Sequence, residues 1–331
     1  MADKPAIDLI EEPSPYQSFA LAEKPTFKAR LIAHFKRWWW VYLLVLIAVT
    51  LLVTLPFIYV GYPRIAQDGI NSATLTILSM EITNPSTSGF HFHQVQELGS
   101  DSIFHPHLYG FNATVRLPGF EDPMMHINVP GLKAKDGATF EVDQDVTLQN
   151  PDVFAEFSKA MMLQEEVTLN IYGRPRLQQP GLQTITVNYN HTISIKGLNR
   201  LAGFEIVELQ LDPNRDDGMN AVGSVLIPNP SVVTLAMGNV TFDLSSGGTE
   251  LGPAIIRDLV VRPGNTTAPI VANINELALL GLLPHSPPFT IEIQARGNSS
   301  MYNGEQLTYY QTALEANPIE FTFDVSSALP S

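Results

Sequence analysis

The chain contains no cysteine among its 331 residues, and this absence excludes several kinds of protein. Disulfide-stabilised scaffolds need paired cysteines, and thiolate metal sites need cysteine ligands. Only 16% of the residues are charged and 45% are hydrophobic, which indicates neither a disordered protein nor one that crosses a membrane many times. Any domain outside a membrane must therefore be held together by its hydrophobic core, and two domains of ordinary size can provide one.

The short motifs of common enzyme classes are also missing. The sequence has no G-x-S-x-G nucleophile turn, phosphate loop, dinucleotide fingerprint or H-E-x-x-H pair. The acidic pairs Asp216-Asp217 and Glu165-Glu166 are interpreted as solvated residues of turns or strand ends, because catalytic carboxylates must face each other across a site. We therefore predict a protein that is not an enzyme, with no catalytic residue and no cofactor.

Positive charge is scarce and unevenly placed. The chain has 19 basic and 33 acidic residues, and six of the basic and five of the acidic ones lie up to Arg37. The remainder of the chain therefore carries 13 basic and 28 acidic residues. A surface this acidic repels nucleic acid, so nucleic acid is excluded as a partner.

One long apolar segment predicts a membrane-spanning helix over residues 38–60. These 23 residues carry no charge, and at ~1.5 Å per residue they reach roughly 34 Å, more than a hydrocarbon core of ~30 Å. Tryptophans 38–40 lie at one end and Tyr59 and Tyr62 at the other, as expected at membrane interfaces. The lipid bilayer is therefore the first predicted partner.

The distribution of lysine and arginine predicts the orientation. Residues 24–37 contain five basic residues and no acidic one, whereas only Arg64 follows closely after the apolar segment. The positive-inside rule therefore places residues 1–37 in the cytosol as a disordered tail, and residues after about 61 outside the cell or in a lumen. The tail also contains Tyr16 and Phe19, in the form of a tyrosine-based sorting signal.

Sequons for N-glycosylation support the same orientation, because all of them follow the apolar segment. Three lie on the polar side of alternating segments that read as strands, where a glycan can point to solvent. The other two, at positions 265 and 298, are expected in turns. The predicted glycosylation sites are Asn112, Asn190, Asn239, Asn265 and Asn298.

The part of the chain after the apolar segment reads as two copies of one unit. Asn84-Pro85-Ser86 corresponds to Asn229-Pro230-Ser231, and a Leu-x4-Gly-x-Thr pattern occurs from Leu132 and again from Leu259. Each copy then has a short helical segment, followed by a further strand. Duplicated units of about 120 residues rich in strands suit tandem β-sandwiches. The expected domains are 61–185 and 186–331, in a mainly β protein with one short helix in each sandwich.

The two helical segments are expected to bury their apolar residues. In the first copy these residues are Val153, Phe154, Phe157 and Met161. In the second copy they are Ile274, Leu277, Leu280 and Leu283 or their neighbours. Both sets have the spacing of one helix face.

The repeated unit resembles the late-embryogenesis-abundant group-two (WHy) domain, and the strands that lead into Asn84-Pro85 and Asn229-Pro230 carry the resemblance. The whole chain is similar to fungal single-pass vacuolar membrane proteins of the type that regulates the proton ATPase and ends autophagy. The resemblance implies β-sandwiches that bind lipid in a groove near the membrane, or a membrane-protein complex. It implies no catalytic residue.

Four histidines form the only constellation that suggests site chemistry. His91 and His93 would share one face of a strand, and His105 and His107 flank a proline. Imidazole binds zinc and copper, so the four are metal-ligand candidates, although no cysteine accompanies them. Two other readings remain open, namely a polar loop and a group that gains charge in an acidic lumen.

The predicted function is that of a non-enzymatic, single-pass type II endomembrane glycoprotein of a fungal vacuole-like compartment. Its lumenal sandwiches would bind lipid or a membrane-protein partner. The first alternative is a cell-surface or wall-facing adhesion or stress protein with the same topology. The second alternative is a lumenal hydrolase.

Overall fold

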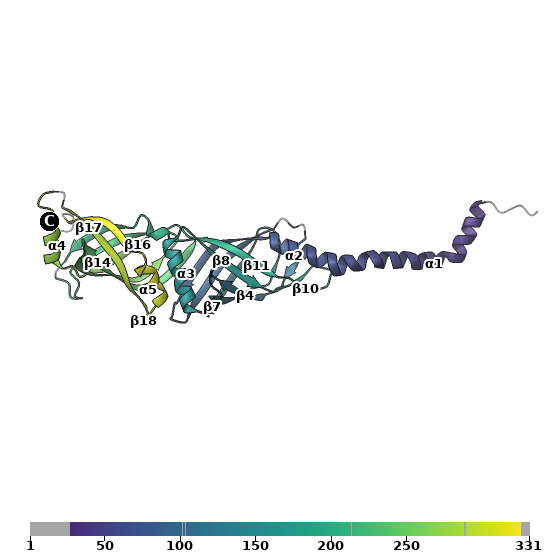
Figure 1. The fold of residues 1–331 in the computed structure, drawn as a ribbon, viewed down its shortest axis with the longest axis horizontal. Coiled ribbons are helices and arrows are strands. Elements are labelled where there is room, and N and C mark those ends of the chain that lie inside the picture. The colour runs from purple at the N-terminus through teal and green to yellow at the C-terminus, as the bar shows by residue number, and fades with distance from the viewer. Residues whose placement is uncertain (1–26, 101, 103, 213, 288, 326–331) are drawn as a thin grey trace, which may run out of the picture. The chain divides into compact units, whose positions relative to one another are not determined.

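The computed structural model describes residues 27–100, 102, 104–212, 214–287 and 289–325. The chain divides into two compact units, and we call the one that ends at Tyr59 unit 1 and the one that begins at Val60 unit 2. Unit 1 is helical, whereas unit 2 is mainly β, as predicted (Figure 1).

The N-terminal helix is longer than predicted. α1 runs over Phe27–Pro56, a π-helical turn follows over Phe57–Gly61, and α2 runs over Tyr62–Ser72. Within the described residues this is the one helix long and apolar enough to cross a membrane.

The expectation of a disordered tail up to residue 37 is wrong for residues 27–37, which are helical. This segment contains Lys, Ala, Arg and Leu and no Pro or Gly, so it extends an existing helix at little cost. The first 26 residues lie outside the described residues, and with them the predicted sorting residues Tyr16 and Phe19.

Within the described residues, unit 2 is built on one large sheet with the strand order β12-β13-β16-β15-β14-β1-β2-β7. β17 adds to β14 and carries β18 and β19. The strands of this sheet are β1 (Thr74–Thr83), β2 (Gly89–Gly99), β7 (Ala138–Thr147), β12 (Glu205–Leu211), β13 (Ala221–Asn229), β14 (Val233–Ser246), β15 (Thr249–Val261), β16 (Gly264–Ala272), β17 (Thr290–Tyr302), β18 (Glu305–Gln306) and β19 (Ile319–Asp324).

Two smaller sheets complete the first half of unit 2, with the orders β10-β9-β3-β6 and β11-β8-β4-β5. Their strands are β3 (His107–Leu108), β4 (Phe111–Arg116), β5 (Met125–Val129), β6 (Leu132–Lys133), β8 (Glu166–Gly173), β9 (Arg176–Gln178), β10 (Ile185–Thr186) and β11 (Tyr189–Lys196). β11 alternates as predicted, with Ile193 and Ile195 buried and Ser194 between them exposed.

The predicted boundary between residues 185 and 186 does not separate two sheets. β11 lies beyond this boundary, yet it pairs with β8 along its whole length. β1 also pairs in parallel with β14, with Met80 opposite Val233. The two predicted domains therefore share backbone hydrogen bonds and belong to one compact unit.

Short helices lie against these sheets: α3 (Pro151–Leu163), α4 (Glu276–Leu282), α5 (Thr308–Glu315) and the 3-10 turn η2 (Asn199–Leu201). α3 begins at Asn150, whose side chain accepts hydrogen bonds from the backbone N–H groups of Asp152 and Val153, as is usual for an N-cap. The four apolar residues predicted to face the core from this helix are buried.

In the second helical segment, a neighbour of the predicted residues is buried in place of two of them. Leu277 and Leu280 are 83% and 61% exposed, while the neighbouring Leu279 is buried. α4 has only seven residues, so a one-residue difference in where it begins turns a different face toward β15.

The order of elements in the predicted repeat is kept, but their pairing is not. In both copies a glycine with positive φ comes first, and a strand, a helix and a second strand follow in that order. The φ angle is 70° at Gly137 and 89° at Gly264. β7 then pairs with β2, whereas β16 pairs with both β13 and β15. The two halves of unit 2 are therefore not two copies of one sheet.

Candidate functional site

α2 is an amphipathic helix that packs beside β11 in the first half of unit 2. Tyr62 and Ile70 of this helix are buried, and Ala66 between them packs against the same core. The Tyr62 hydroxyl accepts a hydrogen bond of 3.1 Å from the backbone N–H of Gln179, directly after β9. The apolar face of α2 is thus part of the interior.

Side chains also bind α2 to the backbone around β11. The Gln67 amide donates to the carbonyl of Asn188 at 2.7 Å and accepts from its N–H at 2.8 Å. His191 Nε2 donates to the carbonyl of Ile70 at 2.9 Å. These contacts hold α2 against the rest of unit 2.

The buried face of β2 changes from apolar to polar along the strand. Phe90 and Phe92 are followed on the same face by Gln94 and Gln96, which are only 2% and 3% exposed, and then by Leu98. This alternation is visible in the sequence, and it was the signal that could have placed both glutamines inside. Glutamine is usually found at the surface, so the two residues were not predicted to be buried.

The neighbours of these two glutamines on the flanking strands are apolar. Gln94 lies opposite Met80 of β1 and Val142 of β7, and Gln96 lies opposite Ile77 and Phe140. The Gln96 amide N–H donates to the Gln94 carbonyl oxygen in a short contact. No other side-chain hydrogen bond forms at either amide within the described residues.

Other buried polar atoms in this half have no partner among the described residues. Gln144 Nε2 is one of them, and Gln144 is the diagonal neighbour of Gln94 on β7. The others are His105 Nδ1, Gln179 Oε1 and the Tyr189 hydroxyl. Burial raises the pKa of Tyr189 above its usual value of 10, so this hydroxyl stays neutral. We call Gln94, Gln96 and Gln144 the glutamine cluster.

The interior around the glutamine cluster carries no formal charge. The buried polar side chains of the described residues are glutamine, asparagine and serine, without a single Asp, Glu, Lys or Arg. Native proteins pair nearly all of their buried polar groups, and Gln94 and Gln96 are paired with each other, while Gln144 Oε1 accepts from the Asn128 N–H at 3.1 Å.

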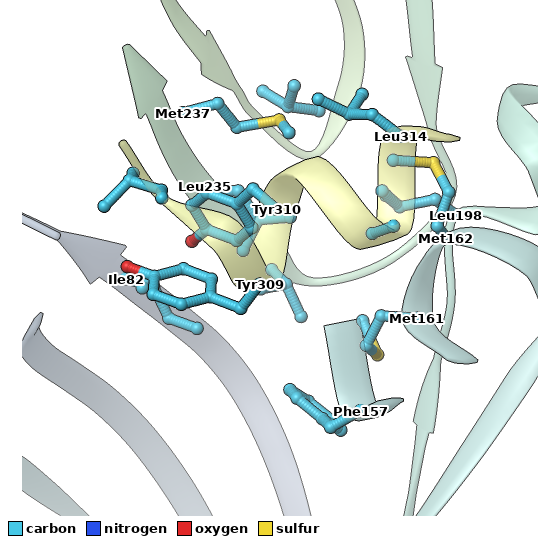
Figure 2. Packing of buried hydrophobic residues seen from close by; sticks show 14 of the residues in the cluster. Ile82, Phe157, Met161, Met162, Leu198, Leu235, Met237, Tyr309, Tyr310 and Leu314 are labelled. Atoms are coloured by element: carbon cyan, nitrogen blue, oxygen red, sulfur yellow. The ribbon is translucent and has the colours of Figure 1, made fainter. Parts of the chain in front are cut away.

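A small internal space lies between α3, α5 and the sheet, at the joint of the two halves (Figure 2). Its lining is apolar apart from Ser158 and Tyr310, and Met161, Met162 and Met237 contribute flexible thioether side chains. The space open to the centre of a water-sized sphere is about 20 Å³, which suffices for a single water molecule.

The Tyr310 hydroxyl is buried at this joint without a partner among the described residues, whereas the adjacent Tyr309 hydroxyl donates to the carbonyl of Ser86 at 2.9 Å. Burial raises the pKa of Tyr310 well above 10. A space of this size is a packing feature of the joint and too small for a lipid.

The four predicted metal-ligand candidates do not form one site. His91 and His93 lie on the outward face of β2, and His107 lies on β3 of another sheet, with His105 just before it. Among the described residues, no group of three or more His, Cys, Asp or Glu side chains is placed to hold a metal ion.

His91 instead lies between two carboxylates of β7. Its Nε2 is 3.0 Å from Asp143 Oδ1, and its Nδ1 is 2.9 Å from Asp145 Oδ1. The hydrogen bond with Asp145 is the main cause that raises the pKa of His91 above 6.5; burial opposes it, and the charges of both carboxylates add to the rise.

All five predicted glycosylation sites are exposed asparagines. Asn112, Asn190 and Asn239 lie in strands, opposite buried neighbours, as expected. The expectation that Asn265 and Asn298 lie in turns is wrong, because they belong to β16 and β17. Asn298 is the extra residue of a β-bulge, since Gly297 lies opposite Phe242 and Ser299 opposite Thr241.

The bulge explains why the R-G-N-S-S segment does not form a turn. A Cβ atom on Gly297 would lie 2.3 Å from the Cβ of Leu314, so the glycine lets α5 approach the strand. Glycine in this segment therefore serves packing rather than a reversal of the chain.

Comparison with known proteins gives one family match. A family model described as a protein of unknown function (DUF3712) matches residues 122–244, from just before β5 to near the end of β14. No curated protein matches the chain.

Some solved structures are similar over much of the chain. Red sea bream transglutaminase covers 78% of it at 9% identity and a TM-score of 0.23, and the chain spans only 31% of that enzyme. The periplasmic chaperone SfaE covers 71%, with 96% of its own length, at 8% identity and a TM-score of 0.19. The CupB6 tip adhesin from Pseudomonas aeruginosa covers 68%, with 94% of its own length, at 9% identity and a TM-score of 0.18. These TM-scores are too low to indicate a shared fold.

Proposed function

We propose that this chain is a non-enzymatic, single-pass type II membrane glycoprotein whose unit 2 binds a lipid in its interior. The observation that carries the proposal is α2. This helix begins two residues after the apolar segment that ends at Val60, and its apolar face is part of the core of unit 2.

The position of α2 in the chain gives a lipid a short route. At ~1.5 Å per residue, Tyr62 follows the apolar segment within one helical turn along the chain. A lipid that passes between α2 and the strand ends would leave one apolar environment and enter another. This reduces the exposure of its chains to water, which costs about 0.8 kcal/mol per CH₂ group.

The orientation in this proposal depends on charge and on the sequons. The basic residues of segment 24–37, before the uncharged apolar segment, favour a cytosolic N-terminus, and all five sequon asparagines are exposed on unit 2. The resemblance to the late-embryogenesis-abundant group-two proteins adds the expectation of a fungal vacuolar membrane. A cell-surface protein with the same topology is the alternative, and localisation of a tagged chain separates the two.

Photolabelling tests the lipid-binding function. The full-length chain in detergent would be irradiated with a phosphatidylcholine and with a diacylglycerol that carry a diazirine in the acyl chain. Labelled peptides would then be mapped by mass spectrometry. We expect labels on buried segments of unit 2 as well as on α1, and a heat-unfolded sample serves as the control.

Labels confined to residues 27–56 would contradict the proposal, because any detergent-exposed helix collects lipid. In that case, binding of a membrane-protein partner by the outer surface of unit 2 becomes the leading account.

A further inference from the structure

The residues of α1 that precede the uncharged segment combine positive charge with large apolar side chains. Residues 27–37 contain four Lys or Arg residues and no Asp or Glu. The side chains of Lys28, Lys36 and Arg37 are exposed, and so are those of the large apolar residues between them. A helix with this surface needs surroundings that accommodate both kinds of side chain.

The apolar side chains form a stripe along one side of the helix. At ~100° per residue, one stripe falls within a sector of roughly 80°, and it consists of Phe27, Leu31, Phe35, Trp38 and Tyr42. Each of these five side chains is at least 43% exposed. Lys36 and Arg37 lie on the other side of the helix, more than ~100° from the centre of the stripe. The N-terminal part of α1 is therefore amphipathic, unlike the uncharged segment that follows it.

α1 bends near its N-terminal end, and the stripe lies on the inner side of the bend (Figure 1). His34 Nε2 is 2.9 Å from the Tyr42 hydroxyl, and the rings of Phe35 and Tyr42 stack with their centroids 4.9 Å apart. In a straight helix, residues that far apart in sequence are separated by more than ~10 Å along the axis. Side-chain neighbours on a helix face are normally three or four residues apart. The contacts therefore bring residues 27–37 toward the side of the helix on which the stripe lies.

This bend suits the surface of a bilayer. A straight helix over residues 27–37 would reach roughly 16 Å beyond the apolar segment, whereas the headgroup layer on one side is only about 5–8 Å thick. Its exposed Phe27 and Leu31 would then lie in water. A helix bent toward its stripe can lie along the surface, with the stripe toward the acyl chains and Lys36 and Arg37 among the headgroups.

We propose that residues 27–37 of α1 form an interfacial helix that binds anionic phospholipids in the leaflet where the apolar segment begins. Phosphatidylserine is one such lipid. The phosphate and carboxylate oxygens of anionic headgroups are the partners of Lys and Arg, and the segment carries no acidic residue that would repel them. The inference goes beyond lipid binding by unit 2 and does not depend on it.

Two observations favour a lipid over an acidic protein as the partner of this helix. The stripe continues without a break into tryptophans 38–40, which belong to the interfacial end of the apolar segment. The stripe also lies on the inner side of the bend, which is the side that faces the bilayer if the apolar segment spans it. A protein partner would instead need an apolar stripe that faces away from the membrane.

A single fluorophore on the stripe tests the proposal. The chain contains no cysteine, so Leu31→Cys provides a unique site for the environment-sensitive dye NBD. The labelled full-length chain would be placed in nanodiscs of phosphatidylcholine alone and of phosphatidylcholine mixed with phosphatidylserine. Both faces of a nanodisc are accessible, so the orientation of the chain does not affect the readout. With phosphatidylserine we expect a blue shift of the emission and quenching by lipids that carry a nitroxide in the acyl chain, and both should weaken at high salt.

Neutralisation of the exposed cations should remove this insertion. The variant combines Lys28→Gln, Lys36→Gln and Arg37→Gln with the labelled Leu31→Cys. Each cation near an anionic surface contributes about fivefold to binding, so the ratio of inserted to free helix should fall about a hundredfold. A variant that keeps the charges, with Lys28→Arg, Lys36→Arg and Arg37→Lys, should insert as the natural segment does.

The matched control makes the same change of net charge on unit 2 and should leave insertion unchanged. It uses three exposed lysines, as Lys133→Gln with Lys135→Gln and Lys196→Gln.

Two results would overturn the proposal. Equal insertion in both kinds of nanodisc, or equal insertion of the neutralised and natural segments, would mean that the positive charges serve only to orient the chain. No insertion in either nanodisc would mean that the helix does not lie on the bilayer, and a cytosolic protein would then be its partner. Photolabelling of unit 2 tests the lipid-binding function separately, because the fluorophore at position 31 reports only on α1.

Discussion

His91 is the residue whose geometry depends most directly on protonation. A neutral imidazole has one donor and one acceptor nitrogen, whereas both ring nitrogens of His91 face carboxylate oxygens that can only accept. Both contacts are favourable only when the ring is charged. The other charged or titratable groups on this face are His93 and Glu97 of β2, Glu81 of β1 and Glu141 of β7.

We expect His91→Gln to lower stability at pH 5 and to have little effect near pH 9. Folding raises the pKa of His91 above 6.5, so its contribution is complete below about pH 6.5 and is lost as the pH rises through the folded-state pKa. Because the side chains of Asp143 and Asp145 are 62% and 92% exposed, the effect should not exceed about 1 kcal/mol.

Urea denaturation of the detergent-solubilised chain at several pH values measures this difference. His93→Gln, on the same face of β2 but outside the ion pair, is the control. An equal loss of stability at pH 5 and pH 9 would show that the two carboxylates do not act through the charge of the ring.

At the scale of elements, α3 and α5 determine how the two halves meet. Phe154 of α3 lies 5.2 Å from Phe90 of β2 and 4.9 Å from Tyr309 of α5, measured between ring centroids. Tyr309 and Tyr310 pack between the sheet and α3 in Figure 2. One aromatic cluster therefore joins a strand of the first half to a helix formed by the C-terminal part of the chain.

Phe154→Ala should destabilise unit 2 by about 3–5 kcal/mol, because the side chain is 1% exposed and its removal leaves a cavity beside two rings. Leu277→Ala, at an exposed position of α4, should change stability by less than about 0.5 kcal/mol. Thermal unfolding followed by circular dichroism compares the two. Similar midpoints for both variants would mean that α3 does not stabilise the joint.

At the scale of the whole molecule, the parallel pairing of β1 with β14 joins the strands from β12 to β7 into the one large sheet of unit 2. A substitution that destabilises one half should therefore also destabilise the other. Two independent sandwiches in tandem would behave differently, because their interface would be small and would break before either core.

Ile256→Ala tests this coupling from the distal half. Ile256 of β15 is fully buried, so the loss should be about 2–5 kcal/mol. If unit 2 unfolds as one body, hydrogen exchange of the amides in β2 should speed up by the same free energy. Exchange in β2 that matches the control Val207→Ala, at an exposed position, would indicate halves that unfold separately.

Glycosylation tests the orientation of the chain. In a eukaryotic host, replacement of each sequon asparagine by Gln should increase gel mobility by one step, and an N-glycosidase should bring all variants to one position. Asn84→Gln should have no effect, because a proline follows Asn84. A chain with no glycan at any of the five sites would contradict a lumenal or extracellular unit 2.

Local patterns in the sequence predicted those elements whose burial in the fold follows the periodicity of the segment itself. The long uncharged segment becomes α1, the alternation around Ile193 and Ile195 becomes β11, and the spacing of Val153, Phe154, Phe157 and Met161 becomes the buried face of α3. In each case the buried face or the length of the element follows from the residues of that segment alone.

Other features depended on contacts far along the chain. Leu277 and Leu280 are exposed because of how the short α4 meets β15, and Asn298 lies in a strand because β17 bulges opposite β14. The four histidines are divided between two sheets by strand order. Sequence periodicity carries no information on any of these pairings.

By itself, the sequence determined that the chain has an apolar helix long enough to cross a membrane, a mainly β remainder and exposed sequon asparagines. These follow from hydrophobicity and from the two-residue period of strands, which are local properties. Only the tertiary structure decided that the two halves share one sheet, that the apolar face of α2 packs in the core, and that Gln94 and Gln96 are buried and bonded to each other. These depend on which strands pair and which faces meet, and pairing between distant segments is set by the packing of the whole core.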